Sequence, residues 1–397
     1  MEINVRKAVE EITPEITAMR NHIHEYPELS MQEYNTCAYL EDYIKKNVDY
    51  DRLKRVGETG LFFEPKGTKP GEGKTIVFRG DIDALPIQED PHNDPCSKIP
   101  GVMHACGHDV HGTINVGAAN ILSKMKDQFS GSIYFFIQQS EENLSGAKLF
   151  LNDPEIDFDK IDDVAALHCS AEIEAGKIGV RYGSILASAD EFDIRVLGKG
   201  GHGAHCHTVK DPVVAASAIV MALQTIVSRE TNPADSVVVS VCMLHGGAAH
   251  NIIPDTVEIG GTVRTLTPED RKRAEESIIR IATSVAEAYG TRAEVDYKHG
   301  VPPFVCEDDW VDRAIRAGKK MLGNENVIML PHAAMGAEDF AYIKEKKPGI
   351  FVRLGSRTPG GPYGSAHSST FYSDSKCIPV GMLTIIGIAA DYFGIDV

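Results

Sequence analysis

Apolar residues recur at helical spacing near the start of the chain and predict an amphipathic helix over residues 3–25, which Pro27 ends. A second helix is expected over 31–47. Short apolar runs closed by glycine or polar residues predict buried strands at 75–79, 131–138 and 163–168. Between the first two strands, a segment rich in small residues predicts a helix at 112–125. Strands that alternate with helices favour an α/β domain.

The pattern changes near residue 184. Residues 192–197 alternate apolar and polar positions, which is typical of a half-exposed antiparallel strand. The elements expected after it are a helix at 213–229, strands at 236–243 and 256–264, a helix at 268–289 and a strand at 292–297. This β-α-β-β-α-β order predicts a ferredoxin-like α+β domain.

Helix signals return at 310–322 and 377–393, with short strands expected near 327 and 350. The α/β pattern therefore resumes after the ferredoxin-like segment. We expect a small domain inserted into a larger, discontinuous one. The expected boundaries are 1–183 and 299–397 for the larger domain and 184–298 for the insert.

Composition agrees with two domains, because the 397 residues are 43% hydrophobic and exceed the usual length of one domain. The net charge of −17 argues against nucleic acid or an anionic membrane surface as a partner. Neither a signal peptide nor a membrane span of about 20 apolar residues is expected. The eight cysteines are scattered along the chain, which favours reduced thiols, and we expect a cytoplasmic protein.

One segment combines a thiol, histidines and glycines within ten residues: Met103-His104-Ala105-Cys106-Gly107-His108-Asp109-Val110-His111-Gly112. Cysteine thiolate and neutral imidazole are preferred ligands of zinc and related ions. Cys106 and His108 are two residues apart, so they can point to one side of an irregular backbone but not of a helix. The segment predicts a metal site, although a buried thiol beside loop histidines would give the same pattern.

Carboxylates follow two of the predicted strands. Asp81 and Asp83 leave the first strand together, and Asp83 is a candidate for orienting a ligand or a base; a solvated turn is the alternative. Glu141 and Glu142 come directly after the strand at 131–138. Adjacent glutamates are usually surface charge, but α/β sheets build their sites at the ends of strands. One glutamate could then bind a metal while the other accepts a proton.

Two further histidines complete the donor set. His168 ends the third predicted strand, and His367 lies in a loop rich in glycine and proline. Together with Cys106, His108 and Glu142 they give five donors. That number is too large for one tetrahedral zinc and suits two metal ions that share a bridging ligand.

In order and spacing, these segments resemble the metal-dependent amidohydrolases and peptidases of the aminoacylase and carboxypeptidase G type. The Cys-Gly-His-Asp segment is similar to the branch with auxin–amino acid conjugate hydrolases, hippurate hydrolases and N-acyl-amino-acid deacylases. The matching stretches are Arg20…His24…Pro27-Glu28-Leu29-Ser30, Arg79-Gly80-Asp81-Ile82-Asp83-Ala84-Leu85-Pro86, Met103 to His108, Glu141-Glu142, Gly200-Gly201-His202-Gly203-Ala204, Asn251-Ile252-Ile253-Pro254, Gly261-Thr262-Val263-Arg264 and Gly336-Ala337-Glu338-Asp339-Phe340. The resemblance implies an α/β metallopeptidase-type catalytic domain with a mixed central sheet. It also implies that the inserted ferredoxin-like domain is a lid that forms a homodimer.

The same resemblance implies roles for the donors. Cys106 would bridge two divalent ions, zinc or else manganese, cobalt or nickel. The remaining ligands would divide between the ions, Glu142 with His367 and His108 with His168.

The resemblance further implies the catalytic and binding groups. Glu141 would be the general base, which takes a proton from the attacking water and passes it to the departing amine. His202 on the lid would stabilise the oxyanion, in the site of the partner subunit, with His207 as the alternative lid histidine. Asn251 and Arg264 would hold the substrate's α-carboxylate, because a guanidinium binds two oxygens at once.

The expected reaction is metal-dependent hydrolysis of an N-acyl or aminoacyl amide, a small-molecule substrate, with release of a free amino acid. A dipeptidase or carboxypeptidase that acts on short peptides is the first alternative. A metal-binding relative without activity is the second, and the intact Glu141-Glu142 pair weighs against it. Departures from the relatives' pattern at Cys169, Cys206 and Ser369 change the pocket walls, so the acyl group and the amino acid are not carried over.

Overall fold

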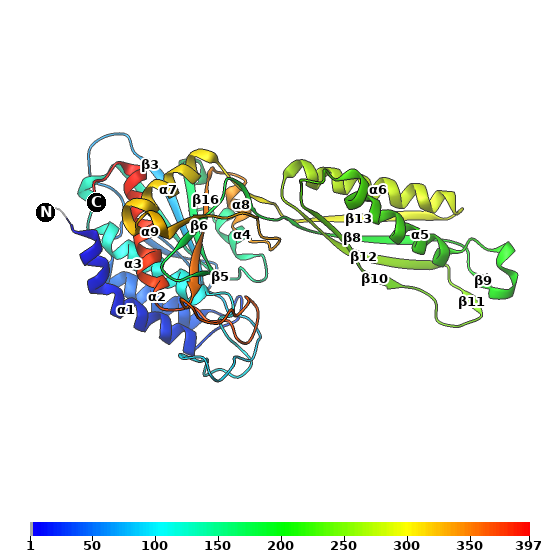
Figure 1. Ribbon diagram of the computed structural model, residues 1–397, viewed down its shortest axis with the longest axis horizontal. Helices are drawn as coiled ribbons and strands as arrows, with labels where there is room; N and C mark the ends of the chain where they lie inside the picture. The colour runs from blue at the N-terminus through cyan, green and yellow to red at the C-terminus, as the bar shows by residue number, and fades with distance from the viewer. Residues whose placement is uncertain (1–2) are drawn as a thin grey trace. The chain divides into compact units, whose positions relative to one another are not determined.

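The computed structural model describes residues 3–397 and divides the chain into two compact units (Figure 1). The larger unit consists of Met1–Gly183, Cys306–His332 and Tyr342–Val397. The inserted unit consists of Ser184–Val305 and Ala333–Ala341. The larger unit is therefore discontinuous in sequence.

An eight-stranded mixed sheet forms the centre of the larger unit, in the order β1-β2-β4-β3-β5-β16-β6-β15. The strands are β1 (Arg52–Val56), β2 (Gly60–Glu64), β3 (Lys74–Asp81), β4 (Gly131–Gln138), β5 (Asp163–Glu174), β6 (Ile178–Val180), β15 (Val327–Met329) and β16 (Gly349–Arg357). The central strands β4, β3, β5 and β16 run parallel, whereas β2 is antiparallel to β4 and β6 is antiparallel to β16. Nearly every residue of β3, β4 and β5 is buried, as in parallel strands covered on both faces.

Helices α1 (Val5–Glu25), α3 (His108–Ser123) and α9 (Cys377–Phe393) pack against one another, and α3 and α9 also contact β3. Every residue of α3 is buried, so it is the central helix of this layer. Helix α2 (Tyr34–Asn47) packs on α3, and α7 (Asp308–Leu322) packs on α9 and β16. The short elements are α4 (Gly146–Leu151), α8 (Ala341–Lys344), β7 (Gly183–Leu186), β9 (Gly201–His202), β11 (Ile252–Ile253) and β14 (Phe304–Cys306).

The inserted unit has the expected β-α-β-β-α-β order. Strands β8 (Ala189–Leu197), β10 (Val237–His245), β12 (Thr256–Thr265) and β13 (Arg292–Val301) form an antiparallel sheet in the order β10-β12-β8-β13. Helices α5 (Pro212–Thr225) and α6 (Pro268–Ala288) pack on each other and on this sheet (Figure 1). Asp211 and Thr267 cap the two helices by accepting hydrogen bonds from backbone N–H groups of the first turn.

The insert extends beyond the expected boundary at residue 298. Strand β13 continues to Val301 because it keeps pairing with β8 as far as Ala189. The segment 333–341 also belongs to the inserted unit, since Ala187 N donates to Gly336 O at 3.0 Å. The hydrophobic pattern of the sequence did not predict that the segment 333–341 joins the inserted unit.

One helix, Pro212–Glu230, is long and apolar enough to cross a membrane by length and composition alone. It consists of α5 and a π-helical turn. One side, with Ala216, Ile219 and Leu223, packs into the core of the inserted unit, and Met221 on another side is exposed. Packing in the core of the inserted unit therefore accounts for the apolar residues on one side of this helix. The eight cysteines are free thiols, and the cytoplasmic location stays a prediction.

Candidate metal centre and active site

Three parallel strands carry most of the predicted site residues to one edge of the large sheet. Asp81 ends β3 and pairs with Gln138, the last residue of β4, after which Glu141 and Glu142 follow. Arg79 of β3 pairs with Ala166, so His168 lies level with Asp81 in the register. The convergence expected from the sequence therefore occurs within the larger unit.

His168 is not at the end of a strand, which corrects the expectation from the sequence. Strand β5 continues to Glu174 because β16 pairs with it along that length, with Arg353 opposite His168. The side chain reaches the edge of β3 and β4 because β5 extends further than its neighbours.

Gly107 sets the path of the segment that carries Cys106 and His108. Its φ of +88° lies in the left-handed region, and an added Cβ would lie 2.7 Å from the Cys169 Cβ. The backbone is irregular through Cys106, and α3 begins directly at His108 rather than at residue 112. Asp109 in the first turn favours this earlier start, because a carboxylate stabilises a helix N-terminus.

The predicted ligands form one cluster in the larger unit. The ligand atoms of Cys106, Glu142 and His367 all lie within 4.8 Å of one another. His367 Nε2 lies 3.4 Å from Glu142 Oε2, and His168 Nε2 lies 3.4 Å from Cys106 Sγ. His367 adopts a φ of +61°, and its backbone N–H donates to Ala105 O at 2.9 Å, which ties its loop to the metal segment.

The second half of the cluster centres on His108. Its Nε2 atom lies 3.8 Å from Glu142 Oε1 and 4.0 Å from Glu141 Oε2. This Nε2 atom is buried and makes no hydrogen bond to any described residue. A buried nitrogen surrounded by carboxylates at these distances is what a divalent ion would satisfy.

Hydrogen bonds at the outer nitrogens set the tautomers of both histidines. His168 Nδ1–H donates to Cys169 O at 2.8 Å, which leaves Nε2 as the acceptor that faces Cys106. His108 Nδ1 lies 3.1 Å from Asp83 Oδ1, so Nε2 faces the cluster in the same way. Such outer hydrogen bonds fix ring orientation and ligand basicity in metal sites.

Asp83 therefore supports the cluster rather than joining it. Besides His108, it accepts hydrogen bonds from Ser30 Oγ at 2.7 Å and from the backbone N–H of Glu142 at 3.0 Å. Its carboxylate is buried, and burial raises its pKa, but the His108 and Ser30 contacts offset this and lower the pKa below its ordinary value. An ionised Asp83 thus orients a histidine and a glutamate at once.

The residue types fit divalent metal ions. Burial raises the pKa of the Cys106 thiol to about 12, so a thiolate at this position needs a nearby positive charge. Burial lowers the pKa of His168 well below its ordinary value and also lowers that of His367, which favours the neutral, metal-binding form of both rings. A buried thiol with neutral imidazoles and carboxylates is the donor set of zinc and of related transition-metal ions.

Asp81 and His111 also lie beside His108 and His168, and the sequence did not single them out as a pair. His111 Nδ1–H donates to Asp81 Oδ1 at 2.5 Å, and the Cys169 backbone N–H donates to His111 Nε2 at 2.7 Å. Both ring nitrogens are thus occupied, and Asp81 is paired with Arg79 at 2.5 Å. These residues support β5 beside His168 and are not free to act as ligands.

A network of buried charges lies beneath the metal segment. Arg20 Nε and His24 Nδ1 donate to Asp109 Oδ2 at 2.7 and 2.8 Å, and His24 Nε2 donates to Glu89 Oε1 at 2.9 Å. Burial lowers the pKa of His24, but Asp109 and Glu89 outweigh this and raise it above its ordinary value. A protonated His24 therefore joins α1 to the residue after His108 and to the loop that holds Glu89.

The proposed lid residues belong to the inserted unit and are described within it. His202 is exposed in β9, which pairs with β11 through Ile252, and Asn251 O accepts a hydrogen bond from Gly203 N at 2.8 Å. Arg264 lies on β12, where its Nη1 donates to Val263 O at 3.1 Å. His202 and Asn251 are thus neighbours across one short strand pair.

Comparison with known proteins gives the class. The model of the peptidase family M20/M25/M40 matches residues 77–390, and the chain belongs to this family. It is 37% identical over 344 residues to an N-acetyl-L-cysteine deacetylase of Bacillus subtilis (strain 168), which covers 86% of this chain and 80% of that one. It is 36% identical over 378 residues to the IAA-amino acid hydrolase ILR1-like 2 of Arabidopsis thaliana, which covers 94% of this chain and 84% of that one.

A solved structure agrees in the fold. A Bacillus subtilis protein described as a dinuclear metal binding peptidase of the M20 family superposes with a TM-score of 0.83 and 30% identity, over 96% of this chain and 98% of that one. The resemblance expected from the sequence and the α/β fold with its mixed sheet are confirmed. The cluster around Cys106 is the part of this chain that could hold such a metal pair.

Metal binding is expected to displace the proton of Cys106. Because burial keeps this thiol protonated at neutral pH, binding of Zn²⁺ or Mn²⁺ to metal-free protein should release one proton more than in Cys106→Asp, whose carboxylate is already ionised. Apparent affinity should therefore rise with pH, by about tenfold per unit for each proton released. Isothermal titration calorimetry of metal binding, repeated in buffers of different ionisation enthalpy, measures the number of protons released by each protein. An equal count in the two proteins would contradict a thiolate ligand.

Proposed function

We propose that the chain hydrolyses the amide bond of N-acyl or aminoacyl amino acids and releases a free amino acid. The observation that carries this proposal is the convergence of the five candidate donors with one further carboxylate, Glu141, at one edge of the sheet. Relatives named as a deacetylase and as an amino acid conjugate hydrolase support the substrate class.

Two divalent ions fit the donors in the expected division. Cys106 would be shared, with Glu142 and His367 on one side and His108 and His168 on the other; the distances within the cluster support this assignment. When bound, the ions would polarise the scissile carbonyl and lower the pKa of water. Zinc, manganese, cobalt and nickel are all compatible with these donors.

Glu141 is proposed as the general base. Its carboxylate lies 4.0 Å from His108 Nε2 and adjoins the ligand Glu142 in sequence, so it reaches the same space. It would accept the proton of the attacking water and then deliver it to the amine that leaves, since a single carboxylate can serve both steps. Asp83 would keep His108 and Glu142 in place while Glu141 moves the proton.

The inserted unit would supply the remaining groups. We assign oxyanion stabilisation to His202 from the partner subunit, because an imidazole N–H can donate to a developing negative charge. His207 lies in the same exposed segment and is the alternative. Asn251 and Arg264 would bind the substrate's α-carboxylate, and closure of the lid would exclude water before the chemical step.

Hydrolysis is tested by amine release from a panel of substrates. The panel contains N-acetyl, N-benzoyl, long-chain N-acyl and indole-acetyl amino acids and dipeptides, each with metal-stripped protein to which Zn²⁺, Mn²⁺, Co²⁺ or Ni²⁺ is restored. We expect metal-dependent release from one acyl class.

Glu141→Gln should lower kcat by about 10²- to 10⁴-fold with normal metal content, whereas Glu142→Gln should lose metal. Release from dipeptides alone would make the chain a dipeptidase, and loss of metal from Glu141→Gln would reverse the two roles.

Arg264 is expected to control affinity for the free carboxylate. Arg264→Ala should raise KM by about tenfold or more for substrates with a free α-carboxylate, and little for the same substrates as carboxamides. Arg195→Ala is the matched control, because Arg195 lies on β8 of the same sheet and pairs with the partly buried Glu294. An equal KM change for acids and carboxamides would remove Arg264 from the binding site.

We also propose that the chain forms a homodimer through the inserted unit. Strand β10 lies at the edge of its sheet and exposes Met243 and Leu244, and α5 exposes Met221, 72% of which is accessible. Exposed apolar residues beside an unpaired strand edge are typical of an interface.

The dimer is tested by sedimentation velocity. Wild-type protein should sediment at twice the chain mass of 43.2 kDa, and Met221→Glu should shift it towards the single-chain mass because a charge would be buried. Met329→Glu, at an exposed position of the larger unit, should leave the dimer intact. A single-chain mass for wild-type protein at micromolar concentration would exclude the dimer.

A further inference from the structure

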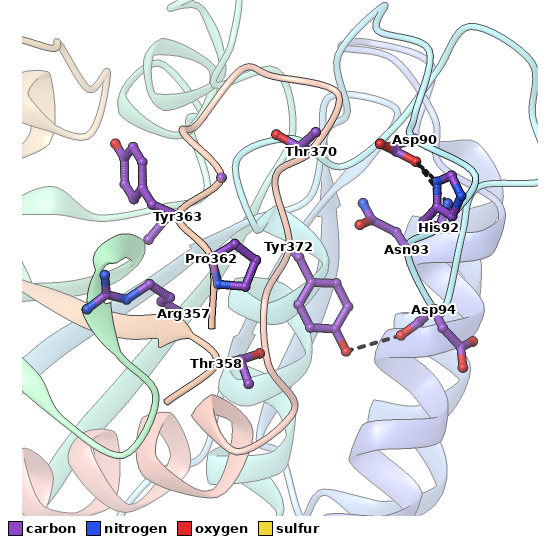
Figure 2. Close-up of a pocket in the computed structure, with 12 residues that line it drawn as sticks. Asp90, His92, Asn93, Asp94, Arg357, Thr358, Pro362, Tyr363, Thr370 and Tyr372 are labelled. Carbon is purple, nitrogen blue, oxygen red and sulfur yellow. Dashed lines mark hydrogen bonds and ion pairs between the residues drawn. The ribbon is translucent and has the colours of Figure 1, made fainter. Parts of the chain in front are cut away.

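The larger unit contains a pocket of about 600 Å³ outside the ligand cluster (Figure 2). Its walls are the loop 90–94, residues of the segment 357–364, Thr370, Tyr372 and Ala171 of β5. This volume lies within the range of small-molecule sites. None of the pocket residues has a role in the metal cluster or in the proton transfers described above.

The pocket walls are continuations of the segments that carry metal ligands. Ala171 lies three residues after His168, and Thr370 lies three residues after His367. The loop 90–94 is fixed to the His367 loop, since Asp90 N donates to Ser369 O at 3.0 Å. The pocket therefore adjoins the edge of the cluster, on the side to which β5 and β16 extend.

The pocket has a cationic side and an aromatic interior. Arg357 lies across the pocket from Asp90 and Asp94, with Pro362 and Tyr372 between them (Figure 2). Asp90 is already occupied, because His92 donates to it from its backbone N–H and its ring. One oxygen of the Asp90 carboxylate is thus already engaged by hydrogen bonds from the pocket wall.

Arg357 has a donor without an acceptor. Its Nε atom is buried and makes no hydrogen bond to any described residue, and its nearest carboxylate, Glu174, lies 4.0 Å from Nη2. The side chain as a whole is 31% exposed and lines the pocket, so its terminal Nη groups face the pocket although Nε does not. An anionic ligand group at this side of the pocket would accept hydrogen bonds from those Nη groups.

We propose that the pocket binds the acyl part of the substrate and that Arg357 selects acyl groups with a carboxylate at the end remote from the amide. This proposal rests on the proposed function. The α-carboxylate of the amino acid is assigned to Arg264, so Arg357 would recognise a second carboxylate. Tyr372 and Pro362 favour a flat or apolar body between the amide and that carboxylate.

Strand register gives the length of the acyl group. Arg353 pairs with His168, and Arg357 pairs with Glu174, four residues further along β16. At about 3.3 Å per residue this is roughly 13 Å beyond the metal ligand, part of which the arginine side chain spans. An acetyl group is too short for this distance, whereas an aromatic acyl group with a carboxylate in the para position reaches towards Arg357.

The first test measures binding without catalysis. Metal-free protein is titrated with 4-carboxybenzamide and with 4-methylbenzamide, which differ in the charge of the remote substituent. The carboxylate should bind about tenfold tighter or more in wild-type protein, as charge-assisted hydrogen bonds do. Arg357→Met should abolish this difference. Lys177→Met is the matched control, because Lys177 also pairs with Glu174 but does not line the pocket, and it should retain the difference.

The second test measures specificity in the metal-loaded enzyme. Arg357→Met should lower kcat/KM by about tenfold or more for N-(4-carboxybenzoyl) amino acids, and leave N-(4-methylbenzoyl) and N-acetyl substrates within about twofold. Equal loss on all three substrates, or a carboxylate preference that survives in Arg357→Met, would overturn the assignment of Arg357. If no N-acyl amino acid is hydrolysed with any metal, the proposed function fails, and the titration still decides whether the pocket binds the carboxylate.

Discussion

The metal segment depends on the buried ion pairs that Asp109 makes with Arg20 and His24. Asp109 accepts from Arg20 and His24 within a region that excludes water, and it stands next to His108 at the first turn of α3. Removal of one partner from such a buried group leaves an uncompensated charge, at a cost of about 3–5 kcal/mol. The start of α3, and with it the direction of the His108 ring, is therefore fixed by a helix almost 90 residues earlier in the chain. In this sense α1 belongs to the site, although none of its residues reaches the cluster.

The hydrophobic pattern predicted those helices and strands in which buried residues recur at a regular spacing along the sequence. Helix α1, the strands β3 and β4, and the βαββαβ order of the insert all follow from such patterns. The hairpin β1–β2 was missed, because β1 is short, carries three basic residues and lies at the sheet edge. The full length of β5 was missed for another reason: its continuation past His168 depends on pairing with β16, which lies almost 200 residues further on. The pattern of neighbouring residues in the sequence cannot predict a pairing between strands so far apart.

The site was predictable where chemistry coincides with strand ends. Asp83 and Glu142 follow buried strands, and the donor types of Cys106 and His108 are those of a metal site, so their convergence could be expected. The hydrogen-bonding partners of Asp109 were not expected. Arg20 and His24 are charged residues four apart on the buried side of an otherwise apolar helix face, and that placement was the one available signal. Their partners could not be inferred, because charge pairing across distant segments leaves no local trace.

His24 also links the cluster to the adjoining pocket. Its second carboxylate, Glu89, accepts from Asn93 Nδ2 at 2.9 Å, so one protonated histidine supports both the metal segment and the loop 90–94 of the pocket wall. Changes on that wall are therefore expected to disturb the proposed ligands as well, because both depend on the same buried charge network. On the opposite wall, Arg357 pairs with Glu174 of β5, and Pro362 is exposed. Substitutions there can alter the pocket while the metal segment keeps its geometry. The fold thus separates the part that performs hydrolysis from the part that can vary with the acyl group.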